Sequence, residues 1–394
     1  ISSIVYQRAK GALQTQPFGT QRDVHIENHE WVSHSMAPKK VALEDVRTLV
    51  GGPECTQPYS ASLLNISAMS YGSLSQNAIM ALNKGALKGQ FYHNTGEGGI
   101  SPYHLQGGDL CWQLGTGYFG CRNAKGEFDE ALFTEKSKWP QVKMIELKLS
   151  QGAKPGKGGM LPGKKVTEEI SQIRGVPMGQ DVISPPYHTA FQTPVGLLEF
   201  LQRLRESSGG KPVGMKLCLG RREEFLELCQ AMVETQLTPD FVMVDGAEGG
   251  TGAAPLEFAN SVGFPLSESV VFVHDTLRQF DLRDRVKVGS SGKIFTAFDV
   301  VRQMAFGADF VGSARGMMLA LGCIQALRCN SNHCPVGVAT TDPYLVRGLH
   351  VTDKTERVAR FHKETIEAFS EILGDMGYKS PRQIRRADVF RRLA

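Results

Sequence analysis

Three closely spaced cysteines, Cys323, Cys329 and Cys334, are the residues whose types most directly suggest chemistry in this chain. Pro335 follows the third, and soft thiolates spaced in this way are typical of iron–sulfur ligation. A zinc site would need a fourth ligand, which His333 could supply. Because His333 is adjacent to Cys334, however, the two side chains would rarely both coordinate the same metal ion. With no fourth cysteine nearby, the sequence predicts a three-iron (3Fe–4S) cluster.

Two glycine-containing loops could hold a phosphate group. Each follows an apolar run, at 286–290 and 309–313, and the second loop opens a helix. Small residues let backbone N–H groups approach phosphate oxygens, and a helix N-terminus adds partial positive charge. Without a dinucleotide fingerprint or a Walker A motif, FMN fits better than a dinucleotide. The residues expected to bind the cofactor here are Gly289, Ser291, Gly292, Lys293, Gly312, Ser313, Ala314 and Arg315.

Lys216 lies within the apolar run Pro212–Leu219. A lysine in such a run is costly to bury unless an anionic group meets it. The alternative is an edge strand with the lysine facing water. In the functional interpretation, its ammonium lies beside the N1–C2=O edge of the flavin, where a cation stabilises the negative charge of the reduced form.

Eight apolar runs, each expected to be a strand, follow one another from about residue 60. Helix-length stretches separate most of them, which is typical of a parallel sheet. Eight runs favour a closed (β/α)8 TIM barrel, of class α/β, over an open doubly wound sheet, and barrels commonly bind phosphate after strands seven and eight. The runs are Leu63–Ser70, Gln90–Thr95, Met144–Ser150, Asp181–Ser184, Pro212–Leu219, Asp240–Asp245, Val286–Ser290 and Asp309–Ser313.

Three segments fall outside this alternation. Residues 1–60 are rich in turn residues and are expected to be a lead-in that packs on the barrel. Residues 97–143 show little periodicity and are interpreted as an insertion. Residues 345–394 are expected to form an extension with an amphipathic helix that packs against the core. The expected FMN-binding barrel spans 61–344, with its iron–sulfur loop at about 323–334.

The composition is that of a soluble globular protein, with 41% hydrophobic and 21% charged residues. No run approaches the roughly 18–20 apolar residues of a membrane-spanning helix, and no signal-peptide core is found. A net charge of +4 is too small to indicate a nucleic-acid-binding face. Few, clustered cysteines favour a metal site and a reducing compartment, so we expect a cytoplasmic protein. An anchor upstream of Ile1 would not be visible in this sequence.

Six motifs run in a fixed order from about residue 60 to 345. They are Ile66-Ser67-Ala68-Met69-Ser70-Tyr71-Gly72, Asn94-Thr95-Gly96-Glu97-Gly98-Gly99, Gln151–Gly163, Ile183–Pro186, Asp245–Gly252 and Cys334–Thr340. Together they resemble the FMN domain of glutamate synthase, and most closely the stand-alone FMN-binding glutamate synthase family. The fold of that family is a (β/α)8 barrel, in agreement with the strand count.

The resemblance implies FMN at the barrel mouth and a 3Fe–4S cluster on Cys323, Cys329 and Cys334. It implies reductive amination, in which 2-oxoglutarate condenses with ammonia and reduced FMN delivers hydride to 2-iminoglutarate, giving L-glutamate. Glu97 and Lys216 would be catalytic residues at the flavin–substrate cavity, with Gln151 and Lys154 on a loop over it. The cofactor-binding residues that these motifs imply are Ser67, Ala68, Met69, Ser70, Asn94, Gln151, Lys216, Asp245 and Gly246.

The chain also departs from the large enzymes of the family. Those begin with a glutaminase domain whose nucleophile is an N-terminal cysteine, whereas this chain begins at Ile1. We therefore expect ammonia to arrive free or from a glutaminase partner. No fingerprint for NADPH is found, so we expect electrons from ferredoxin or a reductase subunit. The segment Cys218–Glu224 differs from the large enzymes, which leaves its substrate contacts open, and Asn330 replaces a histidine found in many relatives.

Two other functions remain open. One keeps FMN but changes the substrate, as in 2-hydroxy-acid oxidation or N-alkyl amino acid synthesis. An oxidase needs a histidine base near the flavin, for which His93, His188 and His274 are candidates. The other is an electron-transfer subunit whose cluster and flavin relay electrons to a partner. Substrate-dependent oxidation of the flavin in the isolated protein separates a synthase from such a relay.

Overall fold

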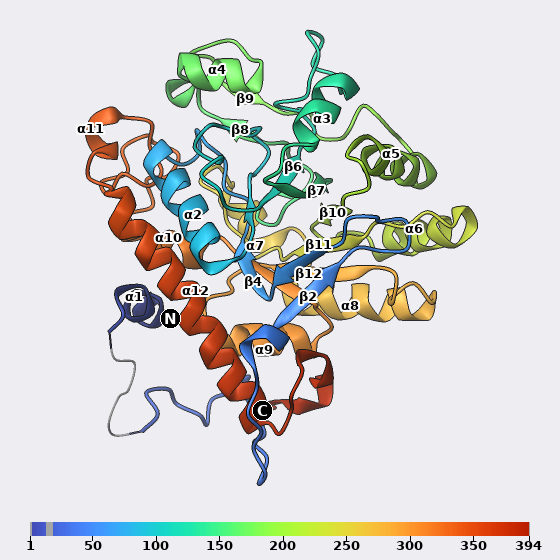
Figure 1. Cartoon of the computed structure of the whole chain (residues 1–394), viewed down its shortest axis with the longest axis vertical. Helices are drawn as coiled ribbons and strands as arrows, with labels where there is room; N and C mark the ends of the chain where they lie inside the picture. The colour runs from blue at the N-terminus through green and yellow to red at the C-terminus, as the bar shows by residue number, and fades with distance from the viewer. Residues whose placement is uncertain (1, 13–18, 394) are drawn as a thin grey trace.

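Eight parallel strands form a closed barrel at the centre of the molecule (Figure 1). The structure is a computed structural model that describes residues 2–12 and 19–393, so residues 1, 13–18 and 394 of the predicted lead-in and extension lie outside it. The strands follow chain order around the ring, and the last pairs with the first, which confirms the predicted (β/α)8 barrel. They are β4 (Leu64–Ile66), β5 (His93–Asn94), β6 (Leu110–Leu114), β7 (Val142–Lys148), β10 (Val213–Leu217), β11 (Phe241–Asp245), β12 (Lys287–Ser291) and β13 (Phe310–Ser313).

The predicted fourth strand is not part of the barrel. It corresponds to β9 (Val182–Ile183), which pairs antiparallel with β8 (Met160–Leu161) in a separate two-stranded sheet. The missing barrel strand is β6, inside the segment 97–143, so the interpretation of that segment as an insertion is wrong. β6 is buried along its whole length, but its polar Gln113 interrupts the apolar pattern. The insertion instead lies between β7 and α5 (Pro194–Ser207).

Helices between the strands cover the outside of the barrel, as Figure 1 shows for α5, α6 and α8. Their starts follow from the sequence, because Thr193 and Thr296 cap α5 and α9 by accepting hydrogen bonds from backbone N–H groups. The helices of the barrel region are α2 (Gln76–Gly89), α3 (Glu130–Ser137), α4 (Glu168–Arg174), α5, α6 (Arg222–Thr235), α7 (Leu256–Ser261), α8 (Leu266–Gln279), α9 (Ala297–Ala305), α10 (Arg315–Leu321) and α11 (Pro343–Val346).

The predicted C-terminal helix is α12 (Val351–Asp375), which lies along the barrel between α2 and α9. It also contacts α10 and the first helix, α1 (Ser2–Lys10). Its apolar residues recur at helical spacing, and Val358, Phe361, Phe369 and Leu373 are buried as expected.

A hairpin closes the N-terminal end of the barrel. Its strands, β2 (Arg47–Val50) and β3 (Tyr59–Ser62), pair antiparallel. Val50 and Ala61 of this hairpin pack in one buried cluster with Phe241 and Phe310, at the starts of β11 and β13. The barrel interior is therefore filled with apolar side chains at this end.

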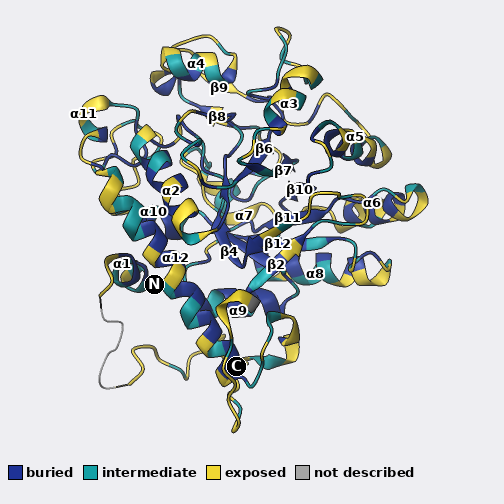
Figure 2. Ribbon diagram, viewed as in Figure 1, coloured by how far each residue is buried: buried dark blue, intermediate teal, exposed yellow. Residues whose placement is uncertain are grey.

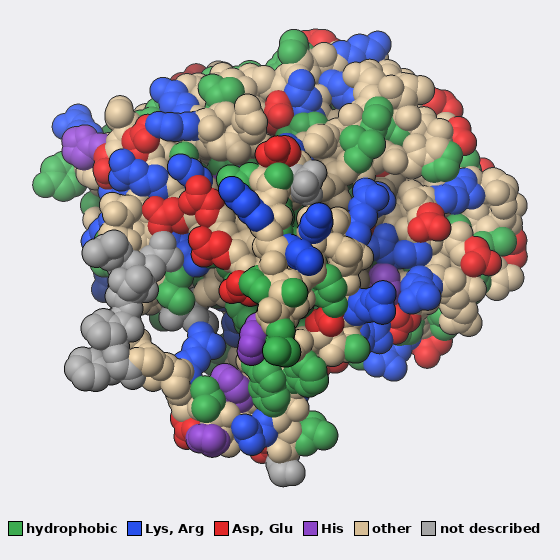
Figure 3. All heavy atoms as spheres, turned by 60° about the horizontal axis from the view of Figure 1, so that its bottom comes forward, with side chains coloured by type: hydrophobic (Ala, Val, Ile, Leu, Met, Phe, Trp, Pro, Cys, Tyr) green, Lys and Arg blue, Asp and Glu red, His purple; other side chains and the backbone are tan. Residues whose placement is uncertain are grey.

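A two-stranded sheet joins an early segment of the chain to its last strand. β1 (Glu30–Val32) pairs antiparallel with β14 (Val389–Arg391), and Glu30 forms ion pairs with Arg302 and Arg391. Buried residues concentrate in the barrel strands and the inner faces of the helices (Figure 2). On the face seen in Figure 3, Lys and Arg side chains are interspersed with Asp and Glu. No helix in the described ranges is both long and apolar enough to cross a membrane.

Candidate functional site

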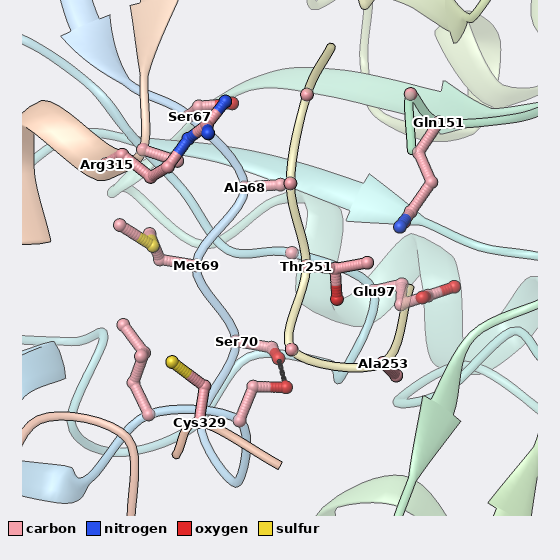
Figure 4. A pocket seen from close by; sticks show the side chains of 18 of the residues that line it. Ser67, Ala68, Met69, Ser70, Glu97, Gln151, Thr251, Ala253, Arg315 and Cys329 are labelled. Atoms are coloured by element: carbon pink, nitrogen blue, oxygen red, sulfur yellow. Dashed lines mark hydrogen bonds between the residues drawn. The ribbon is translucent and has the colours of Figure 1, made fainter. Parts of the chain in front are cut away.

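A cavity of about 510 Å³ lies at the C-terminal ends of the barrel strands. Figure 4 shows predicted residues around one hollow, with Ser67 and Arg315 on one side and Gln151 on the other. This is the end at which TIM-barrel enzymes place their active sites. The predicted site residues that line the cavity are Ser67, Ala68, Met69, Ser70, Glu97, Gln151, Lys216, Asp245, Ser291, Gly292, Lys293, Gly312, Ala314, Arg315 and Cys329.

Six predicted residues do not line the cavity. Asn94 is buried, where its amide donates to Glu146 Oε1 at 2.9 Å and its Oδ1 accepts from the N–H of Gly96. Gly289 faces the packed interior, because a Cβ there would lie 2.7 Å from the Cε of Met243. These two residues shape the barrel around the cavity. The others outside the lining are Gly246, Ser313, Cys323 and Cys334.

The loops after β12 and β13 form one end of the cavity. Within the described ranges, the backbone N–H groups of Gly292, Lys293 and Ala314 have no acceptor in the protein. Arg315 adds a cation beside them, and its guanidinium donates to the carbonyl of Glu248 at 3.0 Å. Free N–H groups next to a cation are what a phosphate requires.

Lys216 is buried in the wall of the cavity, with 5% of its surface exposed. Its Nζ lies 3.4 Å from Oδ2 of Asp245. Burial alone would lower the pKa of Lys216, but the carboxylates of Asp245 and Glu146 outweigh it and raise the pKa above its usual value. Asp245 is itself fixed, because it accepts hydrogen bonds from the N–H of Gly152 and the hydroxyl of Ser291. The wall therefore holds a stable cation.

Glu97 lies next to a second group of cations. Its Oε1 is 2.8 Å from Nζ of Lys148, and both side chains are largely buried. Burial would raise the pKa of Glu97, but the charges of Lys148, Lys154 and Arg174 outweigh it and hold the pKa below its usual value. A Cβ on Gly159 would lie 2.2 Å from the same Glu97 oxygen. The loop that carries Gly159 therefore approaches Glu97 as closely as only glycine allows.

Two of these cations were not predicted. Lys148 is at the end of β7 and lines the cavity. The signal that identified Lys216, a lysine in an apolar run, was also present for Lys148. Arg174 is buried at the end of α4, where burial lowers its pKa to about 10, and it donates to the carbonyl of Tyr71. No local pattern marks Arg174, because its role depends on how the insertion folds over the barrel.

The three clustered cysteines are free thiols in the segment after α10. Burial raises the pKa of Cys329, and Cys323 and Cys334 raise it further. Cys329 lines the cavity, and Figure 4 shows it below Met69, on the same side. Among the described residues, no group of three His, Cys, Asp or Glu side chains is arranged to hold a single metal ion. The iron–sulfur cluster therefore stays a prediction.

The three histidines considered for an oxidase do not line the cavity. His93 is buried in β5. His188 is bonded through Nε2 to the carbonyl of Lys148 at 2.8 Å, and burial lowers its pKa to about 4. His274 lies in α8 and accepts a hydrogen bond from Arg283. In the part of the chain that the structure describes, no histidine base faces this cavity.

A closed (β/α)8 barrel with a cation-rich cavity at the C-terminal ends of its strands places the protein among the TIM-barrel enzymes. A family model described as the conserved region in glutamate synthase matches residues 19–379. The chain belongs to the glutamate synthase family, and with it to the oxidoreductases that act on CH–NH2 donors.

Similar proteins from several organisms support this assignment. The chain is 42% identical over 383 residues to the glutamate synthase large subunit-like protein YerD of Bacillus subtilis. The aligned region covers 96% of this chain and 73% of that protein. It is 35% identical over 322 residues to the archaeal glutamate synthase (NADPH) of Methanocaldococcus jannaschii, and this aligned region covers 81% of this chain. It spans only 60% of that protein's length.

Solved structures with this fold include a flavocytochrome b2 and a mandelate oxidase. The flavocytochrome b2 with benzoylformate superposes with a TM-score of 0.55 at 12% identity, covering 99% of this chain and 78% of that one. A mandelate oxidase with 2-hydroxy-phenylacetamide gives a TM-score of 0.53 at 15% identity, covering 100% and 90%. At such low identity these structures confirm the barrel fold alone.

Proposed function

We propose that this chain binds FMN in the cavity at the C-terminal ends of the strands. The observation that carries the proposal is that the N–H groups of Gly292, Lys293 and Ala314 have no acceptor among the described residues and lie beside Arg315, where barrel strands seven and eight end. This is the position at which barrels commonly bind phosphate. The cavity volume of about 510 Å³ lies within the range of about 300–1,000 Å³ for small-molecule sites. When bound, FMN supplies hydride transfer.

We propose that Lys216 stabilises the reduced cofactor. Its charge is maintained by Asp245, and its buried position limits screening by water. A fixed cation in such a site stabilises negative charge that develops nearby. Backbone groups of the segment Ser67–Ser70, which also lines the cavity, would hold the flavin ring against this wall.

The proposed reaction is the reductive amination of 2-oxoglutarate. Lys148, Lys154 and the amide of Gln151 lie in the cavity lining and would bind the substrate carboxylates. Glu97 is held ionised by the surrounding cations, so it can bind ammonium and then accept a hydrogen bond from the imine N–H. Ammonia condenses with the 2-oxo group, releasing water, to give 2-iminoglutarate, and addition of a hydride to the imine carbon and a proton to the imine nitrogen gives L-glutamate.

We propose that electrons reach the cavity through a 3Fe–4S cluster held by Cys323, Cys329 and Cys334. The donor set supports this, since three free thiols lie within one short segment and one of them lines the cavity. The donor would be ferredoxin or a reductase subunit, and ammonia would come free or from a glutaminase partner. All eight cysteines are free, which supports the reducing cytoplasm as the location.

We further propose that the catalytic unit spans 61–344, with 1–60 and 345–394 as supporting segments. The hairpin β2–β3 supports this division because it fills the barrel end opposite the cavity. Helix α12 supports it because it packs along α2 and α9 on the outside.

The proposed reaction is tested by supplying the purified protein with 2-oxoglutarate, ¹⁵N-ammonium and a chemical electron donor, without oxygen. We expect ¹⁵N-labelled L-glutamate by mass spectrometry. Catalytic oxidation of lactate or mandelate without glutamate formation would contradict the proposal and favour a 2-hydroxy-acid oxidase. A flavin that only passes electrons to an acceptor protein would favour the relay.

A further inference from the structure

Lys165 is a buried ammonium that three backbone carbonyls surround. Its Nζ lies 3.1 Å from the carbonyl oxygen of Ser73, 2.7 Å from that of Cys329 and 3.1 Å from that of Ala339. Only 2% of the residue is exposed. A lysine ammonium has three N–H donors, so these acceptors use all of them. One side chain therefore ties together the loop after β4, the cysteine segment and the segment that follows it.

The place of Lys165 in the fold is the boundary between the cavity and the cysteine segment. Lys165 and Cys329 both line the cavity. On another side, the loop after β11 approaches so closely that a Cβ on Gly252 would lie 3.0 Å from the Cβ of Cys329. Cys329 is thus enclosed between the lysine and this loop, and its position relative to the cavity is narrowly fixed.

The backbone of the cysteine segment needs such a support. Gln325, Leu327 and Asn332 have φ values of +57°, +54° and +65°, in the left-handed region that non-glycine residues seldom adopt. Leu327 is also 88% exposed, so burial of its side chain does not hold the turn. External contacts must therefore stabilise this conformation, and the hydrogen bond from Lys165 to Cys329 is one of them.

We propose that Lys165 is a positioning residue that fixes Cys329 against the cavity and supplies a positive charge between the flavin and the iron–sulfur cluster. The inference rests on the proposed function, since it requires the cluster on Cys323, Cys329 and Cys334. A cluster held by three thiolates carries negative charge, and a buried cation nearby favours the addition of an electron. Lys165 therefore raises the reduction potential of the cluster.

The chain offers a matched control at the other end of the barrel. Lys211 is also buried, and its ammonium donates to the backbone carbonyls of Ser137 and Trp139. It precedes β10, so it lies away from the cavity. A variant of Lys211 therefore loses a comparable buried ammonium without a change near the cysteines.

The test compares Lys165→Gln, Lys165→Arg and Lys211→Gln in the full-length protein with its cofactors. Glutamine keeps N–H donors but removes the charge, whereas arginine keeps the charge. The cluster potential is measured by redox titration followed by electron paramagnetic resonance, beside FMN content and thermal unfolding. We expect Lys165→Gln to lower the ratio of reduced to oxidised cluster at least tenfold at a fixed ambient potential, which is 59 mV for a one-electron couple. Lys165→Arg and Lys211→Gln should stay near wild type.

Loss of the cluster from Lys165→Gln with FMN retained would also support the positioning role. The inference is overturned if Lys165→Gln keeps the wild-type potential, if Lys211→Gln shifts it equally, or if Lys165→Gln loses FMN and iron together by unfolding. A wild-type protein that binds FMN but no iron would overturn the cluster as well. That last result is seen before any variant is made, so the two failures are distinguishable.

Discussion

At the scale of single residues, the cavity wall alternates cations and carboxylates. Lys148 and Lys216 are register partners on the neighbouring strands β7 and β10. Each lysine has a carboxylate partner, Glu97 for Lys148 and Asp245 for Lys216. Two adjacent buried ammonium groups would repel each other, and the carboxylates offset this repulsion. The site can thus keep several cations without bulk water.

Replacing Lys216 with Ala should lower the reduction potential of the flavin and slow turnover. The loss of a cation beside the reduced flavin removes about 1–3 kcal/mol of stabilisation, roughly a 5- to 150-fold change. The potential is measured by anaerobic redox titration, with Lys216→Arg as the variant that keeps the charge. An unchanged potential and rate in Lys216→Ala would mean that Lys216 does not act on the flavin.

Replacing Glu97 with Gln should weaken the use of ammonium more than the use of 2-oxoglutarate. Glutamine keeps the shape of Glu97 but removes the charge that would bind ammonium, so kcat/KM for ammonium should fall about tenfold or more. The KM for 2-oxoglutarate should stay or decrease, because the cations lose a competing anion. Steady-state kinetics with each substrate varied gives both numbers. An equal loss for both substrates would argue against this role of Glu97.

The sequence identified residues whose environment is set locally. Lys216 could be identified because it lies within an apolar run of the sequence, and Lys148 could have been identified in the same way. Arg174 could not, because it reaches the site only when α4 folds over the barrel and is buried behind Glu97. The sites of FMN, substrate and cluster remain predictions.

At the scale of elements, the insertion between β7 and α5 completes the site. It contains β8, β9 and α4, and Figure 1 shows these elements at one end of the barrel. This segment provides Gln151, Lys154 and Lys165 to the cavity lining. The insertion was predicted in the wrong place because β9 has an apolar run but lies outside the barrel, whereas Gln113 interrupts the apolar pattern of the barrel strand β6. Which of these strands belongs to the barrel depends on its pairing with other strands in the folded protein.

Replacing Gly159 with Ala should disturb the contact between the insertion and Glu97. The added Cβ would lie 2.2 Å from Glu97 Oε1, so the carboxylate or the loop must move. Such overpacking costs about 1–3 kcal/mol, and we expect kcat/KM for ammonium to fall about tenfold or more. Gly220→Ala is the matched control, since no atom of the described residues lies within 4 Å of a Cβ there. Equal activity of both variants in the ammonium assay would contradict the proposed geometry.

At the scale of the whole molecule, buried neutral histidines connect stability to pH. Burial lowers the pKa of His104 and His188 to about 4 and that of His362 to about 3. His362 belongs to α12, where it stacks on Phe91 and is hydrogen-bonded to Ser62. Each pKa is lower in the folded state than the value of about 6.5 in the unfolded chain, so the unfolded chain binds more protons between these values.

The free energy of unfolding should therefore fall as the pH is lowered from about 6.5 towards 4. Each histidine contributes up to about 1.4 kcal/mol per pH unit, which gives about 1.6 kcal/mol between pH 6.5 and 5 because the unfolded histidine is already half protonated at pH 6.5. Urea unfolding at pH 6.5 and pH 5 measures the difference in the free energy of unfolding. The variant His362→Gln should show a smaller difference, reduced by the contribution of one histidine. Equal stability at pH 6.5 and 5 would show that these histidines are not buried in the neutral form.

The most direct test of the proposed synthase is a single-turnover experiment. The flavin of the purified protein is reduced without oxygen and mixed in a stopped-flow instrument with 2-oxoglutarate, with ammonium, or with both. We predict rapid reoxidation of the flavin only with both substrates, together with one equivalent of L-glutamate. Reduced flavin that persists with both substrates, or that is reoxidised equally well by 2-oxoglutarate alone, would contradict the account.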